Sequence, residues 1–141
     1  PGVINTLKEL KKYFTLAIVS NCSHKNIKAI LKGAKTPLNL FSIIIGYDEV
    51  KNSKPSPDMI LKTEKTLKTK SLYMVGDSIY DIKAGKRAKV RSIAVLTGHY
   101  SKELLKKEKP YRILKSVNQL LEFIKDYSTA LRIPYRKSEG Q

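Results

Sequence analysis

Apolar residues along the chain form two patterns, short continuous runs and runs in which they recur every three to four positions. The short runs predict buried strands of a parallel sheet, and the spaced runs predict amphipathic helices. The two patterns alternate along the chain, as they do in repeated βαβ units. The predicted strands cover residues 15–19, 41–45, 72–75, 91–96 and 111–114, and the predicted helices cover residues 3–13, 24–35, 57–67, 79–88, 102–107 and 117–127.

Serine residues precede several of the predicted helices. Ser23, Ser56 and Ser101 stand where a hydroxyl can accept a bond from a free backbone N–H of the first helical turn. The whole pattern predicts one α/β domain over residues 1–127, a three-layer α/β/α sandwich with a mainly parallel sheet. Residues 128–141 are polar and basic and show no period, so we expect a frayed or disordered tail.

Two aspartates follow the strand predicted at residues 72–75. Gly76 permits a sharp turn, Asp77 comes next, and Asp81 lies about one helical turn further on. Side chains just past the carboxyl end of a parallel strand lie where open α/β sheets bind ligands. Converging carboxylates of this kind suit Mg²⁺, which takes oxygen ligands. The competing interpretation is a helix-capping Asp77 with an exposed Asp81.

Two further residues suit a phosphate group. Ser20 ends the first predicted strand, so its hydroxyl and the backbone amides that follow can hold a phosphate at the same sheet edge. Lys54 is followed by Pro55 and Pro57, which stiffen the backbone around it. An ammonium fixed in this way can neutralise charge on a phosphoryl group. Taken singly, each residue also has a plain interpretation, a turn serine and a surface lysine.

Composition narrows the class of protein. The chain has 141 residues, of which 41% are hydrophobic and 28% charged, typical of one globular domain. No apolar run approaches the ~20 residues that cross a bilayer. With no signal-peptide pattern and a single cysteine, Cys22, we expect a cytoplasmic protein without internal disulfides. Asp48 and Glu49, in a polar loop, are expected to be solvated.

The net charge of +16 is unusual for a domain of this size. The lysines are spread over almost every predicted helix and form no long basic block. This distribution favours a solvated surface that attracts small phosphorylated substrates, and a basic nucleic-acid binder is the less favoured alternative. We predict no membrane partner, and the sequence leaves the oligomeric state open.

Taken together, these residues resemble the haloacid dehalogenase superfamily of hydrolases, and most closely its phosphoglycolate-phosphatase-like branch. The resemblance extends over about residues 1–125. It rests on three motifs in the family's order, which are Val19-Ser20-Asn21, Lys54-Pro55-Ser56-Pro57-Asp58, and Gly76-Asp77-Ser78 with Asp81.

The resemblance implies a Mg²⁺-dependent phosphate-monoester hydrolase that acts on a small phosphorylated metabolite through an aspartyl-phosphate intermediate. It implies that Ser20 and Lys54 act in catalysis. It also implies that Ser20, Asn21 and Lys54 bind the substrate. Asp77 and Asp81 would hold the metal.

One departure from the family's pattern matters for activity. The family's nucleophile is the first Asp of an Asp-x-Asp motif on its first strand, and this sequence contains no Asp-x-Asp. We therefore expect the nucleophile strand and the cap to be absent, and the sequence to be the C-terminal part of a longer enzyme or a remnant of one. The chain alone is then expected to be inactive. The alternative is a catalytically dead phosphate- or protein-binding module of the same fold.

The missing strand has a predicted structural consequence. In the family that strand lies between the strands that end here at Ser20 and Val75. Without it, those neighbours must either pair with each other or leave backbone N–H and C=O groups unpaired. We therefore expect an incomplete sheet.

Overall fold

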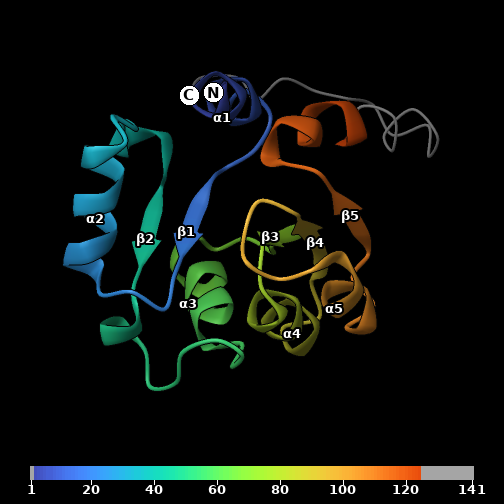
Figure 1. Ribbon diagram of the computed structural model, residues 1–141. Coiled ribbons are helices and arrows are strands. Elements are labelled where there is room, and N and C mark those ends of the chain that lie inside the picture. The colour runs from blue at the N-terminus through green and yellow to red at the C-terminus, as the bar shows by residue number, and fades with distance from the viewer. Residues whose placement is uncertain (1, 125–141) are drawn as a thin grey trace.

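The computed structural model describes residues 2–124, which alternate between strands and helices (Figure 1). The strands are β1 (Ala17–Val19), β2 (Ile43–Ile45), β3 (Tyr73–Gly76), β4 (Arg91–Val95) and β5 (Arg112–Leu114). The α-helices are α1 (Val3–Lys11), α2 (His24–Gly33), α3 (Asp58–Leu67), α4 (Ile79–Arg87) and α5 (Lys102–Lys107). Short 3₁₀ turns cover Leu38–Leu40, Tyr47–Glu49 and Val117–Gln119, and residues 120–124 are helical. The tail predicted for residues 128–141 lies outside the described residues.

All paired strands run parallel, so the predicted α/β class is confirmed. They form two sheets, one of β1 and β2 and one in the order β3-β4-β5. Among the described residues, β1 and β3 do not pair with each other. Of the two outcomes expected for an incomplete sheet, the structure therefore has the one that leaves two open strand edges.

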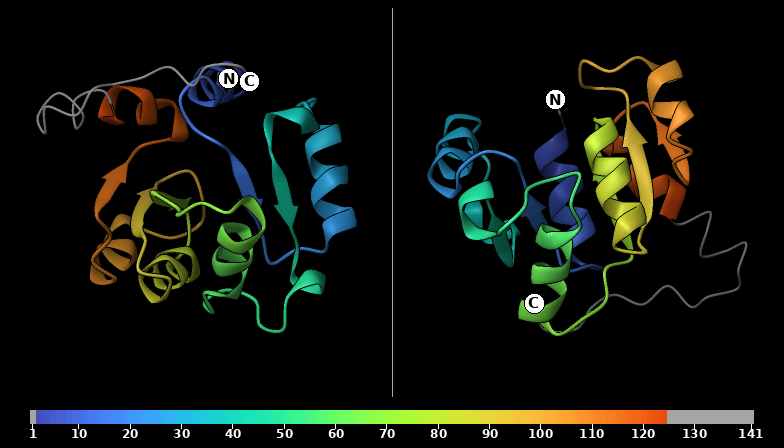
Figure 2. Two further views of the ribbon diagram at one scale, coloured as in Figure 1. Left: turned by 180° about the vertical axis from the view of Figure 1, so that it is seen from behind. Right: turned by 90° about the horizontal axis from the view of Figure 1, so that it is seen from below.

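Helices cover both faces of the β3-β4-β5 sheet and complete three layers (Figures 1 and 2). Along β4, successive side chains point to opposite faces. Ile93 packs with Leu10 of α1 and with the last described helix. Its neighbour Ala94 packs with Ile82 of α4 and Leu105 of α5. Each face of this sheet therefore buries its own apolar cluster.

The strand predicted at residues 15–19 is shorter and less buried than expected. It covers Ala17–Val19, in which Ala17 is exposed and the other two residues are half-buried. The expectation of a buried strand was wrong because β1 has a hydrogen-bonded neighbour on one edge only. The strand predicted at residues 72–75 is displaced by one residue, and Leu72 before it is 61% exposed.

The start of α3 also differs from the prediction. Pro57, at φ −78° and ψ −1°, is the capping residue, and the helix begins at Asp58 rather than at the proline. Ser56 still contributes, because its Oγ accepts a bond from the Asp58 N–H at 3.3 Å. Ser23 and Ser101 cap α2 and α5 as predicted.

Candidate functional site

The loop that follows β1 forms one side of the site. Ser20 is half-buried, and its Oγ accepts a bond from the backbone N–H of Cys22 at 3.1 Å. The loop ends where Ser23 caps α2 through the Asn26 N–H. A hydroxyl, a turn of backbone amides and the N-terminal end of a helix thus follow one another within a few residues, which is a suitable arrangement for an anion.

Lys54 reaches this loop from a segment far away in the sequence. Its Nζ donates to the Val19 carbonyl at 3.1 Å and to Asp81 Oδ1 at 2.5 Å. Its side chain is 11% exposed. The backbone of Lys54 is bound as well, because Asn21 bonds to both its N–H and its C=O at 3.0 Å. One lysine therefore joins the end of β1 to the start of α4.

Asp81 is the most enclosed polar group of the site, with a side chain 9% exposed. While Oδ1 binds Lys54, Oδ2 accepts bonds from the Ser78 N–H at 3.1 Å and the Ser78 hydroxyl at 3.0 Å. Ser78 in turn caps α4 through the Asp81 N–H. A side chain at position 76 would overlap the Asp81 carboxylate, which is why only glycine fits there. Both carboxylate oxygens of Asp81 are therefore engaged.

Asp77 has a different environment. It is exposed and directly follows β3. The turn after β4 folds back over it, so that a Cβ added at Gly98 would stand 2.5 Å from Asp77 Oδ2. Asp77 is thus the carboxylate of the pair that faces solvent.

Two tyrosines beside these carboxylates were given no role by the sequence analysis. The rings of Tyr80 and Tyr100 meet edge to face with centroids 6.5 Å apart. Partial burial raises the pKa of Tyr100, and Tyr80 and the carboxylates of Asp81 and Asp77 raise it further. No local pattern identifies this pair, because Tyr80 lies in the first turn of α4 and Tyr100 lies in the segment after β4.

The predicted site residues therefore lie at one end of the fold. Val19, Asn21, Lys54, Asp81 and Ser78 are joined by direct hydrogen bonds. Ser20 belongs to this group as the chain neighbour of Val19 and Asn21, and Asp77 as the neighbour of Ser78. The described residues contain no group of three or more His, Cys, Asp or Glu side chains arranged so that it could hold a metal ion.

The loop after β2 bonds to the first residue of α2, the helix that follows the Ser20 loop. Asp48 Oδ1 accepts a bond from the His24 N–H at 3.0 Å. Glu49 Oε1 lies 2.5 Å from His24 Nδ1 and accepts a bond from the Gly46 N–H at 3.0 Å. Asp48 is exposed, as expected, whereas Glu49 is half-buried, and both carboxylates also bond to the first turn of α2.

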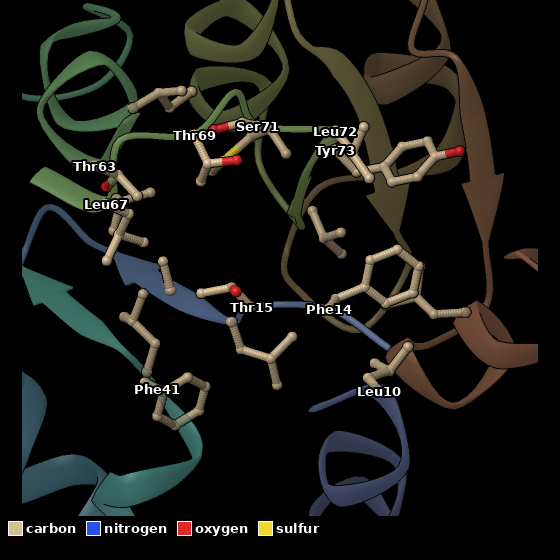
Figure 3. Close-up of a pocket in the computed structure, with 18 of the residues that line it drawn as sticks. Leu10, Phe14, Thr15, Phe41, Thr63, Leu67, Thr69, Ser71, Leu72 and Tyr73 are labelled. Atoms are coloured by element: carbon tan, nitrogen blue, oxygen red, sulfur yellow. The ribbon is translucent and has the colours of Figure 1, made fainter. Parts of the chain in front are cut away.

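A cleft of about 570 Å³ separates β1 from β3. Most of its lining is apolar side chains from α1, β1, α3 and β3. Figure 3 shows Thr15 and Phe41 on one side of this space and Ser71 and Leu72 on the other. The cleft therefore lies where β1 and β3 each have an open edge. In the described part of the chain, no helix has the length and apolarity needed to cross a membrane.

The sequence profile of the haloacid dehalogenase-like hydrolases matches residues 1–95. The chain belongs to this family. Its curated relatives support the phosphoglycolate-phosphatase-like branch, as the motifs around Ser20, Lys54 and Asp77 indicated. The fold and the assignment to a phosphatase family are confirmed.

Three similar proteins illustrate the match. Phosphoglycolate phosphatase from Escherichia coli strain K12 is 31% identical over 142 residues, which cover 99% of this chain and 53% of that protein. A Caldanaerobacter subterraneus protein, PpaX, named as a proposed pyrophosphatase, is 42% identical over 87 residues, covering 60% of this chain and 40% of that protein. A solved hydrolase from Pseudomonas syringae superposes with a TM-score of 0.79 at 26% identity, covering 89% of this chain and 61% of the other. The chain thus spans about half or less of the length of these two curated relatives.

Proposed function

We propose that this chain carries the phosphoryl-binding and Mg²⁺-binding side of a phosphatase that hydrolyses a small phosphate monoester. The observation that carries the proposal is the Lys54 ammonium, held between the carbonyl at the end of β1 and Asp81. A cation fixed at the carbonyl of Val19, the residue before Ser20, is suited to neutralise the charge of a phosphoryl group. Relatives named for phosphatase activity support the same reaction class.

The carboxylates after β3 fit a hard divalent cation. Mg²⁺ is usually bound by one or two carboxylates together with substrate phosphate oxygens and water. Asp77, exposed and past the strand end, would hold the metal directly. Asp81 would join it as a second ligand on releasing a bond from Lys54 or Ser78. When bound, Mg²⁺ neutralises charge on the phosphoryl oxygens and orients them.

The covalent step needs a carboxylate that the described site does not provide, because the sequence has no Asp-x-Asp motif. We propose that a strand ending in this motif fills the cleft between β1 and β3. Its first Asp would attack phosphorus, the bond from phosphorus to the metabolite oxygen would break, and the second Asp would protonate that oxygen. Water would then cleave the aspartyl phosphate to release inorganic phosphate.

The second candidate is a phosphate- or protein-binding module that does not catalyse. The lack of Asp-x-Asp is the observation that favours it. Both candidates use Lys54 and Ser20 to bind an anion, so binding alone does not separate them. They differ in turnover once a strand with the motif is supplied.

Binding is tested by adding inorganic phosphate and Mg²⁺ separately while recording the amide NMR spectrum of the chain. Phosphate is expected to shift the amides of residues 20–23, and Lys54→Met to abolish these shifts. Lys65→Met removes the same charge from an exposed position in the last turn of α3 and is expected to keep them. Mg²⁺ is expected to shift the Asp77 amide, and Asp77→Asn to prevent this. Equal losses in the two lysine variants would mean general charge attraction and would contradict the site.

Turnover is tested with p-nitrophenyl phosphate and Mg²⁺. The chain alone is expected to be inactive, and a fusion that adds a strand and cap with Asp-x-Asp is expected to gain activity. Hydrolysis by the unmodified chain that disappears in Asp77→Asn would show that the proposed source of the nucleophile is wrong. A fusion that folds and binds phosphate without turnover would favour the non-catalytic module.

A further inference from the structure

The side-chain amide of Asn21 both donates to and accepts from the backbone of one distant residue, Lys54. Its Nδ2 donates to the Lys54 carbonyl at 3.0 Å, and its Oδ1 accepts from the Lys54 N–H at 3.0 Å. The two residues are 33 positions apart in the sequence. A reciprocal pair of this kind holds the two peptide units on either side of Lys54, much as a hydrogen-bonded residue pair does in an antiparallel sheet.

Lys54 depends on such support because its segment has no regular secondary structure. Residues 50–57 form bends and turns between a 3₁₀ turn and α3. On the other side of Lys54, the Arg87 guanidinium donates to the Pro55 carbonyl at 3.1 Å. The backbone of the segment is therefore held by side chains rather than by a helix or sheet.

The chain from Val19 to Asn21 holds Lys54 at both ends. Asn21 binds its backbone, and the Val19 carbonyl binds its ammonium at 3.1 Å. These two contacts fix the positions of the Lys54 backbone and of its Nζ atom. The ammonium is thereby directed at Asp81 and kept next to the Ser20 loop.

We propose that the side chain of Asn21 is a positioning group that acts through Lys54. One N–H and the carbonyl oxygen of its amide are engaged with the Lys54 backbone, each at 3.0 Å. The importance of this clamp for catalysis rests on the proposed function, whereas the clamp itself requires neither phosphate nor Mg²⁺. It assigns to the Asn21 side chain a positioning role besides the substrate contact that the family resemblance implied.

The test measures how fast the Lys54 ammonium protons exchange with water. The rate is read by NMR of the chain with ¹⁵N-labelled lysine, and the signal that disappears in Lys54→Arg is assigned to Lys54. Asn21→Ala is expected to speed this exchange about tenfold. A tenfold change corresponds to about 1.4 kcal/mol, which is close to the net contribution of one hydrogen bond to stability. Asn21→Asp retains the acceptor for the Lys54 N–H and is expected to give an intermediate rate. Asn26→Ala, at an exposed position in α2, is the matched control and is expected to have no effect.

The Lys62 ammonium, which donates to the Glu49 carbonyl at 2.6 Å, is the internal reference. Unchanged Lys54 exchange in Asn21→Ala would overturn the proposal. Equal acceleration of Lys54 and Lys62 would also overturn it, because it would show general loosening. If Lys54 alone responds and the chain fails to bind phosphate, the clamp stands and the proposed function fails.

Discussion

The two sheets of this chain differ in how fully their apolar strands are buried. In β4, every residue after Arg91 is buried, whereas in β1 Ala17 is exposed and Ile18 and Val19 are half-buried. β4 has a paired strand on each edge, and β1 has one on a single edge and the cleft on the other. An apolar sequence therefore specifies a strand, but burial of that strand also requires neighbours on both of its edges.

The candidate site lies where the two sheets come together. Lys54 binds the carbonyl at the end of β1 and, through Asp81, the helix that packs on β3 and β4. Polar contacts therefore connect the two parts at one end of the cleft. The following variants test how much more the β3-β4-β5 sheet contributes to stability than the β1-β2 sheet does. They also test how much stability the Lys54–Asp81 contact contributes.

The largest expected difference is between two isoleucines. Ile93→Ala in β4, where the side chain is 1% exposed, is expected to lower the free energy of unfolding by about 4 kcal/mol. Ile18→Ala in β1 is expected to cost only about 1 kcal/mol, because the half-buried side chain loses fewer contacts. Urea unfolding followed by circular dichroism measures both. Equal losses would show that β1 is as well packed as β4.

The connection between the sheets is tested by Asp81→Ala. This change leaves the enclosed Lys54 ammonium without its carboxylate and removes a cap from α4, so we expect a loss of about 3 kcal/mol in the same unfolding assay. Asp58→Ala serves as a control, since Asp58 accepts bonds from Asn52 at an exposed site. Its expected cost is about 1 kcal/mol. A smaller loss for Asp81→Ala than for Asp58→Ala would contradict the proposed connection.

Two glycines contrast close packing with open space. A Cβ at Gly98 would stand 2.5 Å from the Asp77 carboxylate, so Gly98→Ala is expected to cost about 2 kcal/mol. A Cβ at Gly33, at the end of α2, would meet nothing within 4 Å. Gly33→Ala is therefore expected to stabilise the chain by about 0.5 kcal/mol through its higher helix propensity. The midpoint temperature of thermal unfolding should fall for Gly98→Ala and rise for Gly33→Ala.

The smallest expected effect is a pH dependence at Glu49. Partial burial raises the pKa of this carboxyl, but bonds from Gly46 and His24 and the charge of Lys62 outweigh burial and bring it below the ordinary 4.5. A lowered folded-state pKa means that the carboxylate stabilises the fold above that ordinary value and loses this contribution as the pH falls through the folded pKa. Between about pH 6 and about pH 3, the chain should lose about 0.5 kcal/mol more stability than Glu49→Gln does. Parallel pH profiles would contradict this.

Local signals in the sequence were sufficient to predict the order of the strands and helices. The spacing of apolar residues predicted the alternating strands and helices, and Ser23 and Ser101 were identified as caps because a cap acts within three residues of itself. Asp77 was placed after a strand by the same kind of local reasoning. Such signals depend on residues close together in the chain, so they can be seen without a fold.

The contacts that define the site had to be decided by the tertiary structure. Lys54 and Asp81 are 27 residues apart, and Asn21 and Lys54 are 33 apart, so no local period relates them. The sequence by itself supplied the order of elements and the residue types at the strand ends. Only folding decided that β1 keeps an open edge, that Asp81 is enclosed by Lys54 and Ser78 while Asp77 faces solvent, and that Asn21 binds a backbone. The physical reason is that burial and pairing depend on which segments become neighbours in space.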